Sequence, residues 1–96
     1  MIPSVSPEAD SELTEAALFY AGEADADLGL AFIAEFERAL ALLCAQPQLG
    51  ATWRNRRRLP LHRFPYSVIY YVQGEEVRVI ALAHHRRRPT YWAGRR

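Results

Sequence analysis

The spacing of apolar positions changes partway along the chain from a helical period to a period of two. Between residues 13 and 44, apolar side chains recur every three or four positions, which is typical of helices with one buried face. From residue 66 onward, β-branched and aromatic residues gather in short runs, which is typical of strands. The pattern therefore predicts a helical first half followed by a β-sheet.

The first helix has a clear start signal. Residues 1–6 are partly β-branched, which favours a short edge strand before the helix. Ser6 then suits the N-cap position, and Pro7 suits the first helical position because it has no backbone N–H to leave unpaired. The apolar face that follows consists of Leu13, Ala16, Ala17, Tyr20 and Ala24.

The second helix is expected to begin after a turn or frayed junction at residues 26–29. Its apolar face consists of Phe32, Ile33, Phe36, Leu40, Leu43 and Cys44. Pro47 ends it, because proline cannot continue the helical hydrogen-bond ladder. The first half is therefore predicted to be a helical hairpin.

The second half is predicted to form an antiparallel sheet. Residues 52–59 are expected to be one extended basic segment, and residues 66–72 and 77–83 to be strands joined by a hairpin turn. The apolar faces of the helices must cover one side of this sheet. We therefore expect a two-layer α+β fold in a single domain spanning residues 1–96.

The composition of the chain indicates in which cellular compartment the protein is found. Half of the residues are hydrophobic, which is enough for a core. Charged residues interrupt every apolar run well short of the ~18–20 residues of a membrane span, and the N-terminus lacks the pattern of a secretory signal. Cys44 is the only cysteine, so an internal disulfide is excluded. These features predict a soluble, cytoplasmic protein without a membrane partner.

The net charge of +1 hides a strong separation of charge along the chain. Residues 1–37 carry nine acidic residues and no basic one, whereas residues 38–96 carry twelve arginines and two glutamates, giving −9 and +10. The codon usage of a GC-rich genome would by itself produce the absence of lysine. Arginine also suits carboxylate, phosphate and aromatic partners.

Two basic segments are candidate binding surfaces. Four arginines lie within residues 54–58, where they suit either a solvated edge strand or contact with nucleic acid or an acidic protein. Residues 86–88 are three arginines followed by Tyr91 and Trp92, which suits anionic and stacking partners unless the tail is simply disordered. The two histidines before this tail lie on opposite sides of a strand end without further ligands nearby, so no metal site is expected.

A set of residues spread over nearly the whole chain occurs in an order that is typical of one known family. It comprises Pro7 to Asp10, Ala17, Tyr20, Phe32, Phe36, Leu40, Pro47, Gly50, Arg58, Leu59, Arg63 to Tyr66, Ile69 to Tyr71, Val77 to His84, Arg86 to Pro89, Tyr91 and Trp92. This set resembles the RelE/ParE toxin superfamily. The resemblance implies a short strand, a helical hairpin and an antiparallel sheet completed by a three-stranded C-terminal meander.

The resemblance also implies a function. Members of this superfamily are toxins of type II toxin–antitoxin systems, each neutralised by a cognate antitoxin in a hetero-oligomeric complex. RelE-like members are ribosome-dependent mRNA endoribonucleases, whereas ParE-like members poison DNA gyrase. RelE-like sites resemble each other in holding an arginine at the central-strand position of Ser67, and their common lysines are absent here.

We therefore predict a ParE-like gyrase inhibitor that is not an enzyme, binds no cofactor and has a ParD-like antitoxin. The residues expected to contact the target or the antitoxin are Arg57, Arg58, Arg63, Arg86, Arg87, Arg88 and Trp92. The first alternative is a RelE-like nuclease acting on mRNA at the ribosome, with His85 and Tyr91 as its acid and base. The second is a non-catalytic remnant that only supports antitoxin-mediated repression.

Overall fold

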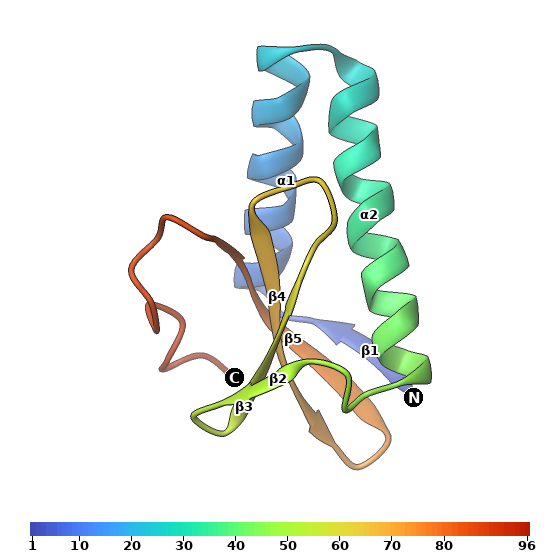
Figure 1. The fold of residues 1–96 in the computed structure, drawn as a ribbon, viewed down its shortest axis with the longest axis vertical. Coiled ribbons are helices and arrows are strands. Elements are labelled where there is room, and N and C mark those ends of the chain that lie inside the picture. The colour runs from blue at the N-terminus through green and yellow to red at the C-terminus, as the bar shows by residue number, and fades with distance from the viewer.

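The computed structural model describes all 96 residues, which form two helices and five strands. The elements in chain order are β1 (Ile2–Val5), α1 (Pro7–Glu23), α2 (Ala26–Ala45), β2 (Ala51–Trp53), β3 (Arg56–Pro60), β4 (Tyr66–Gln73) and β5 (Glu76–His84). The two antiparallel helices lie against the sheet and extend beyond it at one end (Figure 1). The predicted α+β class is confirmed.

The five strands form one mixed sheet in the order β1-β5-β4-β3-β2. β1 pairs with β5 in parallel, whereas every other neighbouring pair is antiparallel. The short N-terminal segment is therefore an edge strand, as predicted, and it lies beside the C-terminal strand. The tight turn between β4 and β5 is also confirmed, with Gly74 at a φ of +60°.

The predicted N-cap of the first helix is confirmed, but the predicted junction at residues 26–29 is wrong. Ser6 accepts a hydrogen bond from the Ala9 amide at 3.1 Å. Asp25 is the N-cap of α2 and accepts one from the Leu28 amide at 2.9 Å, so residues 26–29 form the first turn of that helix. Gly29 serves close packing rather than a turn, because a Cβ there would lie 2.7 Å from the carbonyl oxygen of Ala17 on α1.

The extended segment expected at residues 52–59 is a hairpin. Arg54 and Asn55 adopt positive φ values of 49° and 63°, and Trp53 pairs with Arg56 across this two-residue turn. Two-residue hairpin turns usually contain Asn-Gly or Asp-Gly, and the sequence here has neither. The three-stranded meander of β3, β4 and β5 is therefore extended by β2 at the far edge.

The main core lies between the helical hairpin and the sheet. It includes an aromatic cluster of Tyr20, Phe32, Phe64 and Tyr66, with ring centroids 5.0 to 6.4 Å apart. Tyr70 is fully buried, and its hydroxyl donates to the Pro47 carbonyl at 2.8 Å and accepts from the Gly50 amide at 2.9 Å. This tyrosine therefore fixes the exit of α2 against the sheet.

The opposite face of the sheet is also covered. Ile69, Ile80 and Ala81 are at most 1% exposed and form a second apolar cluster with Trp92 from the C-terminal tail. The strand pattern alone predicts one buried face, because it does not show that the tail folds back. Neither helix is long and apolar enough to cross a membrane.

The helix contact at Gly29 is testable by stability measurements. Gly29→Ala is expected to lower the free energy of unfolding by about 1–3 kcal/mol, because the added methyl group meets backbone that cannot yield easily. Gly22→Ala is the matched control, since a Cβ there has open space, and it should leave stability unchanged or raise it by up to about 1 kcal/mol. Urea denaturation measures both, and equal effects would contradict the packing role.

Candidate functional site

The C-terminal tail, residues 85–96, folds back along the sheet face opposite the helices (red in Figure 1). Trp92 anchors it, being 3% exposed and packed edge-to-face on Trp53 with ring centroids 5.6 Å apart. The tail is therefore an ordered part of the domain. Trp92 offers little surface to a partner while the tail lies on the sheet, and its predicted contact with the target or the antitoxin stays a prediction.

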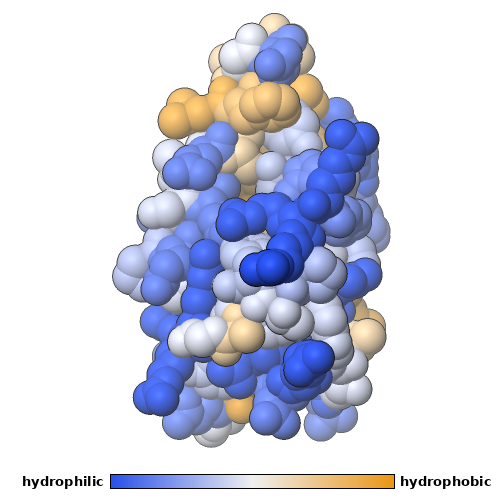
Figure 2. Space-filling view, turned by 90° about the vertical axis from the view of Figure 1, so that its left-hand side faces the viewer, coloured by the Kyte–Doolittle hydropathy of each residue, from blue (hydrophilic) through white to orange (hydrophobic).

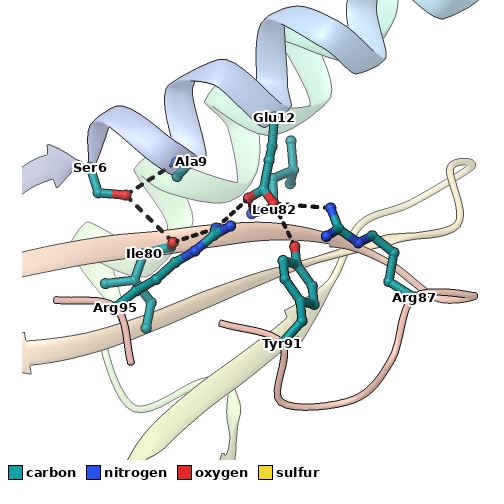
Figure 3. A network of polar contacts seen from close by, with 8 residues as sticks. All are labelled: Ser6, Ala9, Glu12, Ile80, Leu82, Arg87, Tyr91 and Arg95. Atoms are coloured by element: carbon teal, nitrogen blue, oxygen red, sulfur yellow. Dashed lines mark hydrogen bonds and ion pairs between the residues drawn. The ribbon is translucent and has the colours of Figure 1, made fainter. Parts of the chain in front are cut away.

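One carboxylate holds the tail in place (Figure 3). Oε1 of Glu12 accepts hydrogen bonds from the Leu82 amide at 3.0 Å and from the Arg95 guanidinium at 2.8 Å. Oε2 accepts from the Tyr91 hydroxyl at 2.7 Å and forms an ion pair with Arg87 at 3.5 Å. Glu12 therefore joins α1, β5 and the tail.

The position of Glu12 follows from where β1 ends. The parallel pairing of β1 with β5 stops at Val5 and Val79, which leaves the next part of the β5 edge without a strand partner. Ser6 follows this edge, donating its amide to Val79 and its hydroxyl to the Ile80 carbonyl at 3.4 Å. α1 thus starts against β5, and its Glu12 side chain satisfies the next free amide on the edge.

Tyr91 is held as a protonated phenol. Its hydroxyl donates to the Glu12 carboxylate, and the guanidinium of Arg87 lies 3.8 Å above its ring. Burial and the hydrogen bond to Glu12 raise the pKa of Tyr91 well above its usual value. A phenol in this state donates a structural hydrogen bond and is a poor proton acceptor at neutral pH.

The two histidines have separate environments. His84 lies edge-to-face on Tyr66 with centroids 4.9 Å apart, and burial together with nearby Arg86 lowers the pKa of His84. His85 is exposed, and its Nε2 lies 2.9 Å from the hydroxyl oxygen of Ser67, which is 1% exposed. No group of three His, Cys, Asp or Glu side chains is placed to hold a metal ion.

The candidate arginines divide into two groups. Arg57 is engaged by the fold, because it donates to the carbonyls of Gln48 and Gly50 at 3.1 and 2.9 Å. Arg87 is likewise engaged, by Glu12 and Tyr91. The others are exposed and form no side-chain hydrogen bond or ion pair: Arg58, Arg63, Arg86 and Arg88.

Figure 2 shows hydrophilic surface over the middle of the face that carries the tail. His85 and Tyr91 line one pocket there, but their polar atoms bond to different partners, Ser67 and Glu12. Sequence reasoning missed Glu12 and Arg95 as tail anchors. Its only signal was the acidic outer face of the first helix, which favours a solvated surface and leaves internal screening of the basic sheet as the alternative.

The fold defines the class of protein first. It is similar to a solved structure of a chromosomal ParDE toxin–antitoxin system from P. aeruginosa, with a TM-score of 0.77, 19% identity, and coverage of 88% of this chain and 95% of that one. The family model described as the ParE toxin of the type II toxin–antitoxin system parDE matches residues 4–89. The chain therefore belongs to the ParE toxin family. No curated protein matches it significantly.

The anchoring role of Glu12 predicts energetic coupling with Tyr91. Glu12→Gln should lower the free energy of unfolding by about 1–3 kcal/mol, because an amide cannot accept from all the donors that converge on the carboxylate. Combining it with Tyr91→Phe should reveal a coupling energy of about 1 kcal/mol in a double-mutant cycle measured by urea denaturation.

The control for this cycle is Glu15→Gln, which removes an exposed carboxylate of α1 that forms no hydrogen bond in the structure. Its effect should stay within about 0.5 kcal/mol. Additive effects of Glu12→Gln and Tyr91→Phe would show that Glu12 does not hold the tail through this tyrosine.

Proposed function

We propose that this toxin inhibits DNA gyrase without cutting nucleic acid, in the cytoplasm where gyrase acts, and that a ParD-like antitoxin neutralises it. Membership of the ParE toxin family supports the toxin role and the antitoxin partner. The observation that carries the choice against nuclease chemistry is the engagement of the Tyr91 hydroxyl by Glu12.

A nuclease that uses the 2′-hydroxyl of RNA needs a base and an acid poised on the same phosphate. Tyr91 is the tail tyrosine that would serve, but its proton is directed to Glu12 and its pKa is raised. Ser67 holds the position where RelE-like sites carry an arginine, and it bonds to His85 instead of offering a charge. These features favour a protein-binding toxin and make ribosome-dependent mRNA cleavage the second candidate.

An antitoxin has both apolar and charged surface to bind. Leu18 and Phe19 on α1 are 67% and 57% exposed, and Figure 2 shows hydrophobic surface toward the helical-hairpin end above the hydrophilic tail. Contiguous exposed apolar surface marks sites of interaction with other proteins. A segment carrying apolar and acidic side chains, folding as it binds in a hetero-oligomeric complex, would match both regions.

The decisive experiment is a gyrase supercoiling assay with the purified chain, with and without its antitoxin. Inhibition that the antitoxin relieves is the expected result. If a chain that arrests growth leaves supercoiling intact but cleaves mRNA on ribosomes, gyrase is not the target. A chain that is folded but does not arrest growth would instead be a non-catalytic remnant.

The tail arginines predict a loss of toxicity without a loss of fold. Replacing Arg86, Arg87 and Arg88 together by Gln should abolish growth arrest and gyrase inhibition, because two of the three side chains are free to contact a partner. Circular dichroism should show the native fold. Of the three arginines only Arg87 forms an ion pair, and its side chain is half exposed, so the loss of that ion pair should cost little stability. Full toxicity of the folded triple variant would exclude this surface.

Tyr91→Phe separates the two candidate functions. It removes the hydroxyl and keeps the ring beneath Arg87, so a gyrase inhibitor should retain its activity. The matched variant His85→Ala should behave in the same way. Loss of mRNA cleavage in both variants, with the fold intact, would establish the nuclease.

A further inference from the structure

A pocket of about 80 Å³ lies between the β2–β3 hairpin, the end of β5 and the tail. Elements distant in sequence meet there, and together they contribute basic, aromatic and apolar side chains. The lining consists of Trp53, Arg58, Ser67, Ile69, Ala83, His84, His85, Arg87, Arg88, Pro89, Tyr91 and Trp92.

Basic side chains are concentrated in this pocket, and two of its arginines have no partner. Three arginines and two histidines line it, and no acidic residue does. Arg87 forms an ion pair with Glu12 and lies over the Tyr91 ring. Arg58 and Arg88 have no ion pair or side-chain hydrogen bond. Placing like charges together around a cavity is unfavourable unless an anion can enter it.

The floor of the pocket is preformed. The Ser67 hydroxyl is buried on β4 and fixes the imidazole of His85 at 2.9 Å. The packed pair of Trp53 and Trp92 supports the hairpin and the tail that carry the free arginines. An anion that enters therefore meets a fixed Ser67–His85 pair and ordered backbone beneath the free arginines, which reduces the entropy lost on binding.

We propose that this pocket binds a phosphate group of a DNA strand. Donors approaching from β3, from β5 and from the tail suit a tetrahedral phosphate better than a planar carboxylate, which a single arginine satisfies. The surrounding aromatic rings suit neighbouring bases. The pocket binds the phosphate and does not cleave it, because the Tyr91 hydroxyl is committed to Glu12. This site does not depend on gyrase as the target.

The test is binding of fluorescein-labelled dT12 and of a 20-base-pair duplex to the full chain, followed by fluorescence anisotropy at several salt concentrations. Arg58→Gln/Arg88→Gln should weaken binding roughly tenfold or more. If two phosphate contacts are lost, the slope of log K against log salt for dT12 should also fall by about 1.4. Comparing the two probes shows whether the phosphate comes from a single strand or from a duplex.

The charge-matched control is Arg38→Gln/Arg96→Gln, which removes one arginine of α2 and one at the C-terminus, neither of which lines the pocket. It should change the affinity by less than about twofold at the same salt concentration. Quenching of tryptophan fluorescence by dT12 is expected in the wild type, because Trp53 lies at the pocket.

Three results would overturn the proposal: no binding of either probe, equal weakening by the two double variants, or tighter binding of poly-glutamate with the same dependence on Arg58 and Arg88. The last result would identify an acidic protein segment as the occupant. Gyrase inhibition that persists in a chain unable to bind either probe would leave the proposed function standing and remove only the phosphate site.

Discussion

The carboxylate of Glu12 satisfies a free amide on β5 and, through Tyr91, Arg87 and Arg95, holds the C-terminal tail on the sheet. The carboxylate is 12% exposed, so its charge is screened less than that of a surface ion pair. If the tail were released, Trp92 and the apolar cluster beneath it would be exposed to water. One buried negative charge from the acidic half of the chain therefore organises the basic half.

This arrangement decides which residues remain for a partner. Trp92 is buried against the sheet, the Tyr91 hydroxyl is bonded to Glu12, and Arg57 is bonded to backbone carbonyls. The side chains left free include arginines of β3, of the β3–β4 loop and of the tail, together with apolar residues exposed on α1. A surface of this kind suits recognition of another macromolecule more than catalysis, which agrees with the function that we propose.

The sequence predicts the elements better than it predicts their contacts. Local signals such as Ser6-Pro7 and the period of the strands depend on a few neighbouring residues, so the helix start, the strands and the edge position of β1 are readable. The hairpin at Arg54 and Asn55 is not predicted from the sequence, because its turn lacks the glycine that usually marks such turns.

The candidate site is less readable for a physical reason. Seventy residues or more separate Glu12 from the groups that it binds, and nothing local distinguishes it from the exposed Glu15. The burial of Trp92 has the same cause, since it depends on a sheet face that exists only after folding. Charge counting indicates the right segments but not which arginines are free.

Amide hydrogen exchange of the free chain, followed by NMR, tests the central claim most directly, namely that the tail is a folded part of the domain. The account predicts slow exchange of the Leu82 amide, which bonds to Glu12, and measurable protection of the Ala93 and Arg95 amides, which bond within the tail. Exchange of the Ala93 and Arg95 amides at the rate of an unstructured peptide, with an exposed Trp92 indole, would contradict it.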